Sequence, residues 1–451
     1  MTRTCLCWMA ALLLVAVLAE RAMGDEVSFS SDIAPILLEN CQSCHGPKKV
    51  EGGYRVDTFE AAAGEGDSGL LGFLAADLEE SEAFRRIISN DESERMPLDS
   101  DPLSKEQTEL LKRWIEQGAK FDGQDPKIDL VTLVARAAQP DPPEKYPHPL
   151  PLTAMQFSHD GQHLFVGGYH EVTVWSVGDG KLLRRITNIG QRTLALDLSP
   201  DGKVLAVAGG APGRNGSIRT IDVATGELRS VLGLSGDLVM DVRFSPDGKH
   251  IAAGNVAREL LVFDAESGET VHTISRHSDW VNAVAWSPDG TKLVTGSRDK
   301  FCKVFDAKTG ELTYSYNHGQ PVKGITFLPN GTEVFSSGSD NKVQRWQIAN
   351  GKKAAEFVFG DEVFKLPALT ESLFAVSADK TVRQIDPKEN KEVRQFLGHE
   401  DWPLSVDVHA GTKRLATGDY RGEVRIWNTE DGAPVVTFTA APGYSRQLSA
   451  K

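Results

Sequence analysis

The feature that most constrains the fold is a repeat in the larger, C-terminal part of the chain. A Ser-x-Asp-Gly turn or a variant of it recurs with glycines at positions 161, 202, 248, 290 and 331, at intervals of 41, 46, 42 and 41 residues. A second mark is an aromatic residue or isoleucine before a polar residue. It occurs at Trp175, Ile221, Phe263, Phe305, Trp346, Ile385 and Trp427. A period of about 40–45 residues with short alternating strands predicts a β-propeller, so we expect residues 152–443 to form an all-β propeller of seven blades.

The fourth unit illustrates the four strands expected of each blade, at Val281–Trp286, Lys292–Gly296, Cys302–Asp306 and Leu312–Tyr316. The seventh unit ends in an apolar segment at 435–438, which can serve as its own outer strand. We therefore expect no strand to be exchanged between the ends of the ring. Closure would then depend on side-chain packing or on the segment before residue 152.

Three units carry a histidine, a hydroxyl residue, an aspartate and an aromatic residue at matching places. The sets are His277, Thr295, Asp299 and Phe305; His318, Ser336, Asp340 and Trp346; and His399, Thr417 and Trp427, with Arg421 in the place expected for the aspartate. This pattern resembles the buried hydrogen-bond chain of WD40 repeats. A catalytic triad is needed once, whereas this set recurs from blade to blade, so we interpret it as structural.

Two tryptophans are candidate contact residues on the propeller. Trp280 and Trp402 each end a His-x-Asp-Trp segment that precedes an inner strand, near one face of the ring. Exposed there, they would bind a protein partner; half-buried, they would be packing residues, and the sequence leaves both readings open. The glycine-rich stretch 209–216 lacks the Gly-Lys-Ser/Thr ending and the helix of a phosphate loop, and is expected to be an extended hairpin.

Ahead of the repeats lies Cys41-Gln42-Ser43-Cys44-His45. Cys-x-x-Cys-His is the attachment signature of a c-type haem. The two thiols can add to the two vinyl groups of the porphyrin, and the histidine can ligate the iron. The motif predicts covalent haem c on Cys41 and Cys44, with His45 as an axial ligand, provided that the chain is exported.

Three short helices are expected around this motif. The first starts near Ser31 and leads into Cys41, the second covers 81–89 with Phe84, Ile87 and Ile88 inward, and the third follows a Ser-x-x-Gln capping box at 104–107 and ends at Gly118. Its apolar face would consist of Leu110, Leu111, Trp114 and Ile115.

The second axial ligand is sought by elimination. His45 is the only histidine and Met96 the only methionine between residues 25 and 125. Met96 precedes a proline in an acidic loop between the second and third helices, so we expect its thioether to ligate the iron. The alternative is a surface methionine and an iron with an open or water-bound site.

Residues 27–121 resemble the planctomycete-type cytochrome c domain. The matching pieces are 27–29, 32–33, 35–37, 41–46, 54–58, 81–87, 95–97 and 111–119. The resemblance implies a small all-α cytochrome c domain, placed at 25–125, with His45 and Met96 as axial ligands. Leu98 departs from it, because the family often has a second proline there.

The N-terminus indicates export. A basic start, an apolar run from Met9 to Ala19 and small residues before Asp25 are typical of a signal peptide at 1–24. The run is shorter than the ~20 residues that span a bilayer, and no later segment is expected to cross one. Cleavage would remove Cys5 and Cys7, and Cys302, in an apolar strand, is expected to be a buried, inert thiol. These features together indicate a bacterial periplasmic protein.

The charge is unevenly distributed. Residues 25–125 hold 23 acidic and 10 basic residues, a net charge of −13, while the rest of the chain is close to neutral. A basic redox partner would complement this part of the chain, although the charge could equally be solubilising. Without a basic patch, nucleic-acid binding is not expected. The proline-dense segment within 126–151 is expected to be a semi-rigid linker, and 444–451 a tail.

These features favour an exported cytochrome for electron transfer or redox sensing, whose propeller docks a protein, rather than an enzyme. One alternative is a periplasmic oxidoreductase with a second cofactor or a substrate in the propeller, which is the plan of the haem-d1 nitrite reductases. Those propellers have eight blades, however. The other alternative is a scaffold in which the haem is mainly structural.

Overall fold

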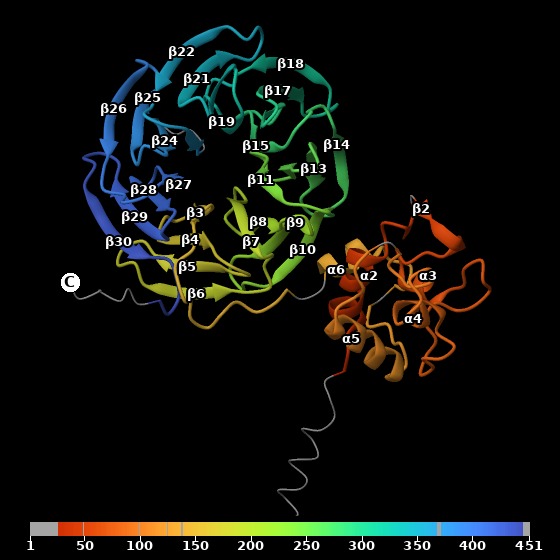
Figure 1. Cartoon of the computed structure of the whole chain (residues 1–451). Helices are drawn as coiled ribbons and strands as arrows, with labels where there is room; N and C mark the ends of the chain where they lie inside the picture. The colour runs from red at the N-terminus through yellow and green to blue at the C-terminus, as the bar shows by residue number, and fades with distance from the viewer. Residues whose placement is uncertain are drawn as a thin grey trace, which may run out of the picture. The chain divides into compact units, whose positions relative to one another are not determined.

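The structure, a computed structural model, describes residues 26–47, 49–98, 100–123, 125–136, 139–367 and 371–444. The chain forms two compact units, residues 1–137 and 138–451 (Figure 1). The expected signal peptide and residues 445–451 of the expected tail lie outside the described residues. In the described ranges, no helix has the length and apolar character needed to cross a membrane.

The first unit is built from short helical segments with long connections. They are η1 (Phe29–Ile33), α2 (Ala34–Asn40), η2 (Glu51–Gly53), α3 (Phe59–Ala63), α4 (Glu82–Ile87), α5 (Lys105–Glu116) and α6 (Leu130–Arg136). A two-stranded ladder of β1 (His45–Gly46) and β2 (Lys49–Val50) accompanies them. The sequence had suggested an all-α unit. The structure adds this short ladder to the helices, because the chain folds back on itself directly after the Cys-x-x-Cys-His motif.

Helix α5 is the best-predicted helix of this unit. The Ser104 hydroxyl accepts from the Gln107 N–H at 3.2 Å, and the Gln107 side chain accepts from the Ser104 N–H at 2.9 Å, which confirms the capping box. Leu111, Trp114 and Ile115 are buried, and the chain turns at Gly118, whose φ is +102°. This amphipathic helix supplies much of the core.

Two expectations about the other helices were wrong. The first helical segment begins at Phe29, two residues before Ser31, and is capped by Ser28 in place of Ser31; the Ser28 hydroxyl accepts from the Ser31 N–H at 3.0 Å. This start lets both Phe29 and Ile33 bury completely. Ile88, expected to point inward, is 52% exposed because α4 ends at Ile87.

The first unit extends beyond residue 125. Leu130 and Leu133 of α6 are buried in the same core as Phe29, Leu37 and Trp114. The division between the units therefore lies at 137–138, not at the expected end of the cytochrome domain.

In the described part of the second unit, seven four-stranded antiparallel sheets are arranged in a ring (Figure 1). The inner strands are β3 (Met155–Phe157), β7 (Arg192–Leu198), β11 (Val239–Phe244), β15 (Val281–Trp286), β19 (Val322–Phe327), β23 (Val363–Lys365) and β27 (Pro403–His409). The second strands are β4 (His163–Gly167), β8 (Val204–Ala211), β12 (His250–Asn255), β16 (Lys292–Ser297), β20 (Glu333–Gly338), β24 (Leu373–Ser377) and β28 (Arg414–Asp419).

The third strands are β5 (Val172–Ser176), β9 (Asn215–Asp222), β13 (Leu260–Asp264), β17 (Phe301–Asp306), β21 (Lys342–Gln347), β25 (Val382–Asp386) and β29 (Glu423–Asn428). The outer strands are β6 (Leu182–Ile186), β10 (Leu228–Ser235), β14 (Thr270–Ile274), β18 (Leu312–Asn317), β22 (Lys353–Val358), β26 (Lys391–Phe396) and β30 (Pro434–Thr439). The four strands predicted for the fourth blade agree with β15–β18 to within one residue at each end. All seven marker residues, from Trp175 to Trp427, are buried in third strands. The predicted hairpin at 209–216 is the β8–β9 connection.

Each blade consists of consecutive strands, so no strand is exchanged at the seam between the seventh and first blades, as expected. Instead, Asp407 of the seventh blade accepts from the Phe157 N–H at 2.7 Å and from the Gln156 side chain at 3.1 Å. The Leu152 N–H donates to the Asp419 carbonyl at 3.1 Å, and the Ser405 hydroxyl donates to the Leu152 carbonyl at 2.6 Å. Hydrogen bonds thus close the ring where other propellers can use a shared strand.

The proline-dense segment takes part in this closure. The buried Tyr146 donates its N–H to the Pro442 carbonyl at 3.0 Å and its hydroxyl to Glu171 at 2.7 Å. Arg185, which forms an ion pair with the fully buried Glu171 at 2.6 Å, also donates to the Pro143 carbonyl at 2.7 Å. This segment is bound along the first blade and reaches the end of the seventh.

Candidate functional site

The Cys-x-x-Cys-His motif forms a helical turn at the end of α2. The Cys41 N–H donates to the Leu37 carbonyl at 3.0 Å, and the Cys44 and His45 N–H groups both donate to the Cys41 carbonyl, at 3.1 and 2.9 Å. Cys41 is half-buried against the core, Cys44 is exposed, and neither is in a disulfide. The turn therefore brings two free thiols and an imidazole together at one end of a short helix.

The environment of Cys41 argues against a redox-active dithiol. Burial, with Cys44 nearby as a second cause, raises the pKa of the Cys41 thiol to about 12. Reactive dithiol pairs instead have a cysteine whose pKa is lowered, because the thiolate is the nucleophile.

His45 is held in one orientation. Its Nδ1 lies 3.2 Å from the Tyr54 carbonyl oxygen, so the ring donates this N–H and Nε2 carries the lone pair. The Val56 N–H donates to the His45 carbonyl at 2.8 Å, which fastens the backbone of the same residue. A Cβ on Gly46 would lie 2.4 Å from the Gln42 carbonyl oxygen, so the tight exit from the turn requires glycine.

Met96 lies in the loop between α4 and α5, as expected. It is half-buried, and its N–H donates to the Arg86 carbonyl of α4 at 3.1 Å. This bond ties the loop to the helix.

The buried histidine sets of the propeller form the expected hydrogen bonds. His277 contacts Asp299 at 2.8 Å and Thr295 at 2.7 Å. His318 contacts Ser336 at 2.9 Å and Asp340 at 3.2 Å. In both blades the histidine bridges a hydroxyl on the second strand and a carboxylate in the next turn, which confirms the structural interpretation.

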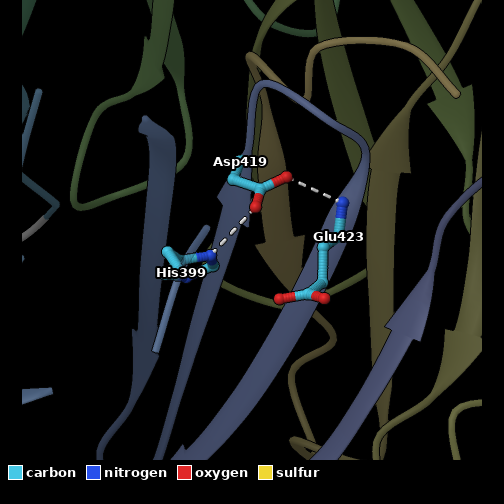
Figure 2. Close-up of side chains that lie close together, drawn as sticks. All are labelled: His399, Asp419 and Glu423. Carbon is cyan, nitrogen blue, oxygen red and sulfur yellow. Dashed lines mark hydrogen bonds and ion pairs between the residues drawn. The ribbon is translucent and has the colours of Figure 1, made fainter. Parts of the chain in front are cut away.

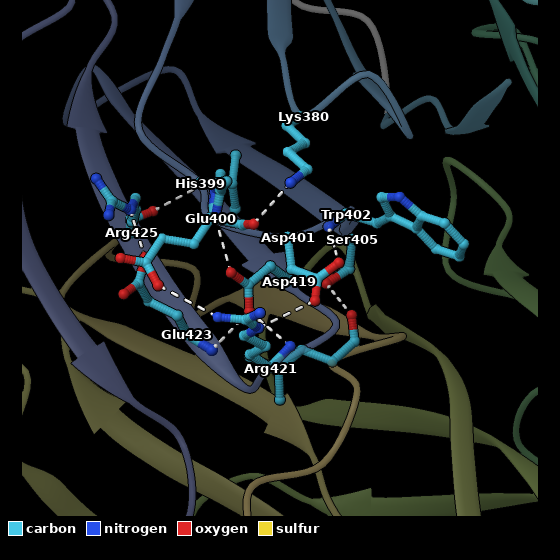
Figure 3. Close-up of polar contacts among 12 residues, drawn as sticks. Lys380, His399, Glu400, Asp401, Trp402, Ser405, Asp419, Arg421, Glu423 and Arg425 are labelled. Carbon is cyan, nitrogen blue, oxygen red and sulfur yellow. Dashed lines mark hydrogen bonds and ion pairs between the residues drawn. The ribbon is translucent and has the colours of Figure 1, made fainter. Parts of the chain in front are cut away.

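In the seventh blade, the expectation that the carboxylate is lost to Arg421 was wrong. Asp419 replaces it: its Oδ2 lies 3.2 Å from His399 Nδ1, while His399 Nε2 lies 2.8 Å from the Thr417 hydroxyl. Arg421 instead forms ion pairs with Asp401 at 3.1 Å and Glu400 at 3.3 Å (Figure 3). The carboxylate comes from the end of β28 and not from the turn after it.

The same blade holds three side chains of metal-ligating type. His399, Asp419 and Glu423 each have a ligand atom within 4.8 Å of the others (Figure 2). These atoms already have protein partners. Asp419 accepts from the Arg421 and Glu423 N–H groups, both at 2.9 Å, and Glu423 accepts from Arg425 at 2.5 Å. We assign the group to blade structure.

One face of the propeller carries its exposed aromatic residues. In the described part of the propeller, Tyr169, Trp280, Trp402 and Tyr420 lie in connections from outer to inner strands or from second to third strands, and Phe301 is the first residue of β17, directly after such a connection. In an antiparallel blade both kinds of connection lie on the same face, which we call the aromatic face. Its aromatic character distinguishes it from the opposite face, where Ser-x-Asp-Gly turns recur.

The two candidate tryptophans differ in how available they are. Trp280 is 36% exposed, but the Arg298 guanidinium carbon lies 4.6 Å from its ring centroid and covers it. Trp402 is 44% exposed, and its ring centroid lies 6.1 Å from that of Tyr420, which is 51% exposed. Arg421 braces the loop that carries Trp402. Trp402 and Tyr420 therefore form an accessible, supported aromatic pair.

Sequence reasoning missed a set of charged residues on the inner strands. Lys365 of the sixth blade donates to the carbonyls of Thr153 at 2.8 Å and Leu194 at 2.7 Å, in or next to the inner strands of the first and second blades. Arg243 forms an ion pair with Asp241 at 3.0 Å. The sequence did hold a signal for these contacts, because Lys365, Arg243 and Asp241 are charged residues within otherwise apolar inner strands.

Comparisons with known proteins agree with this division of the chain. Residues 41–99 match the family model for planctomycete cytochrome C, and residues 226–264, 268–306, 310–347 and 390–428 match that for the WD domain, G-beta repeat. The structure extends the repeat to seven blades.

Similar curated proteins include the target of rapamycin complex subunit wat1 of Schizosaccharomyces pombe, which is 25% identical over 294 residues, 61% of this chain and 78% of wat1. The transcription factor unc-37 of Caenorhabditis elegans is 28% identical over 26% of this chain and 19% of its own length. The ribosome biogenesis protein WDR12 homolog of Arabidopsis thaliana is 24% identical over 28% of this chain and 30% of its own length. The chain thus spans less than a third of unc-37 and of the WDR12 homolog. On these findings, this chain joins a planctomycete cytochrome c domain to a seven-bladed β-propeller of WD40 repeats.

Proposed function

We propose that the chain is an exported c-type cytochrome that transfers electrons or senses redox state, and that its propeller docks a protein partner. The observation that carries the proposal is the turn at residues 41–45. It presents two free thiols, and a histidine whose Nδ1–H is bound to the Tyr54 carbonyl and whose Nε2 is left to ligate iron. This donor set fits covalent haem c, with thioether bonds from Cys41 and Cys44 and His45 as an axial ligand. The haem would supply one-electron chemistry.

Met96 is proposed as the second axial ligand. Its half-buried position in a loop tied to α4 supports this role. A thioether ligand raises the reduction potential, so the proposal predicts a lower potential when Met96 is removed.

The test is the absorption spectrum and reduction potential of the periplasmically expressed protein beside Met96→Ala. We expect a covalently bound, six-coordinate, low-spin haem and a fall in potential in the variant. Leu98→Ala, in the same loop, is the matched control and should leave the spectrum unchanged. A Met96→Ala protein with the wild-type spectrum and potential would exclude Met96 as a ligand, and a wild-type protein without covalent haem would contradict the proposal itself.

We propose the aromatic face as the docking surface. Trp402 contributes more to binding than Trp280, because Arg298 covers the Trp280 ring. Wild-type protein, Trp402→Ala and Leu397→Ala should be compared for capture of periplasmic proteins. Leu397 is 63% exposed, lies in the same connection between β26 and β27 as Trp402, and serves as the non-aromatic control. We expect a partner whose capture is lost only with Trp402→Ala; equal capture by all three proteins would exclude Trp402 as a contact.

The acidic charge of residues 25–125 supports a basic redox partner for the cytochrome unit. Its association should weaken as salt rises, because exposed charges are screened.

A further inference from the structure

Tyr54 touches the axial-histidine candidate in two ways. Its carbonyl oxygen lies 3.2 Å from His45 Nδ1, and its ring centroid lies 5.6 Å from the imidazole centroid at an interplanar angle of 65°. Because both contacts come from one residue, the position of the tyrosine side chain and the position of the carbonyl that holds His45 are linked.

The phenol of Tyr54 is itself anchored. Its hydroxyl donates to the Ala62 carbonyl at 2.5 Å, in helix α3, and burial raises its pKa. Helix α3 is fixed at its start by Thr58, whose hydroxyl accepts from the Ala61 N–H at 3.1 Å. The tyrosine therefore connects a capped helix to the imidazole.

Two glycines leave the space that this side chain occupies. A Cβ on Gly72 would lie 2.0 Å from the Tyr54 hydroxyl oxygen, and one on Gly66 would lie 3.0 Å from the Tyr54 Cβ. The ring is thus enclosed by close backbone, and its hydroxyl has a defined partner.

We propose that Tyr54 is a positioning residue for His45: the bond from its phenol to Ala62 fixes the carbonyl that accepts the His45 Nδ1–H. The inference rests on the proposed role of His45 as an axial ligand. A hydrogen bond from Nδ1 makes the imidazole a more basic ligand and favours the oxidised iron. When the phenol is released, that bond weakens, the reduction potential rises and the Nδ1 proton exchanges faster with water.

The experiment compares wild-type protein, Tyr54→Phe, Tyr54→Leu and the control Phe73→Leu. Phe73 is buried in the same core and packs on Trp114, with ring centroids 5.5 Å apart, so its replacement perturbs the core through another contact. For each protein we would measure covalent haem content, reduction potential and the exchange rate of the His45 Nδ1 proton by NMR.

We expect all four proteins to carry covalent haem. The potential should rise from wild type to Tyr54→Phe to Tyr54→Leu, exchange should be about tenfold faster in Tyr54→Leu, and Phe73→Leu should match wild type. Unchanged potential and exchange in both Tyr54 variants would overturn the inference, as would equal changes in Phe73→Leu. If the wild-type protein lacks covalent haem, the proposed function fails. Exchange of the Nδ1 proton in the haem-free proteins then still decides whether Tyr54 holds His45.

Discussion

At the scale of single residues, the centre of the propeller is held by charged side chains that cross between blades. Lys365 bonds to carbonyls of two other blades, and Asp197 and Asp407 each accept an N–H from the inner strand of the next blade, at 2.6 and 2.7 Å. Burial raises the pKa of Asp197 to about 6 and that of Asp407 to about 7, and it lowers the pKa of Lys365 to about 8. These groups resist ionisation while they serve as inter-blade links.

Asp407 makes the stability of the propeller depend on pH. Its pKa is about 7 in the folded chain and about 3.9 when unfolded. The folded state therefore binds more protons between these values, and its stability falls as pH rises from about 4 to 7. Asp407→Asn keeps an oxygen for the Phe157 N–H and removes the ionisation. Over this pH range, we expect the free energy of unfolding of Asp407→Asn to fall by about 2 kcal/mol less than that of the wild type. This figure is roughly half of what the full pKa shift would give, because the Asp407 side chain is only half-buried.

Urea unfolding at several pH values between 4 and 7.5 checks this expectation. Asp407→Ala is the control, since it removes both the charge and the acceptor and should be less stable than Asp407→Asn at every pH. Parallel pH profiles for wild type and Asp407→Asn would refute it.

At the scale of elements, the seventh blade shows how a turn and a strand can exchange roles. Asp419 at the end of β28 binds His399, while Arg421 in the following turn binds Asp401 and Glu400. The blade keeps its buried hydrogen-bond chain, and the freed turn position supports the loop that carries Trp402.

Replacing these two neighbours should therefore have unequal effects. Asp419→Ala leaves the buried His399 without its carboxylate and should destabilise the propeller by about 3 kcal/mol. Arg421→Ala breaks only exposed ion pairs and should cost less than about 1 kcal/mol. Chemical denaturation of both variants measures their free energies of unfolding. Equal losses of stability would contradict the assignment of the buried structural role to Asp419.

The elements that the sequence predicted well are those that depend on interactions between residues close together in the chain. The capping box of α5 involves residues three apart, and the blade period sets strands that pair with their immediate neighbours in sequence. Residues 41–45 were likewise readable, because five adjacent positions form the turn. Prediction failed where a role depended on geometry across strands. Aligning the turns placed Arg421 opposite Asp299, but the distance to His399 is decided by where β28 ends. The Tyr54 carbonyl that holds His45 was also invisible, because a main-chain acceptor leaves no residue-type signal.

At the scale of the whole molecule, the segment read as a spacer is part of the propeller. Proline density correctly indicated an extended backbone, but nothing local showed that Tyr146 would meet Glu171 and Pro442, far away in the sequence. These long-range bonds connect the first blade, through Glu171, to the segment that follows the last blade, at Pro442.

Removing the Tyr146 hydroxyl should weaken the seam. Tyr146→Phe leaves one oxygen of the fully buried Glu171 without that donor, and we expect a loss of about 1–2 kcal/mol of propeller stability. Tyr169→Phe, at a 38% exposed tyrosine of the same blade, is the control and should change stability by less than about 0.5 kcal/mol. Thermal unfolding that gives the same midpoint for Tyr146→Phe and wild type would show that the seam does not depend on this bond.

The hydrogen bond between Tyr146 and Pro442 also means that the two chain ends of the ring meet. Since every blade is complete in itself, the ring has no obligatory starting blade. A circular permutant that joins residue 444 to residue 145 and opens any connection between blades would retain all seven sheets. The cytochrome domain could then be attached at any of the blade junctions, which makes its point of attachment a matter of gene order and not of folding.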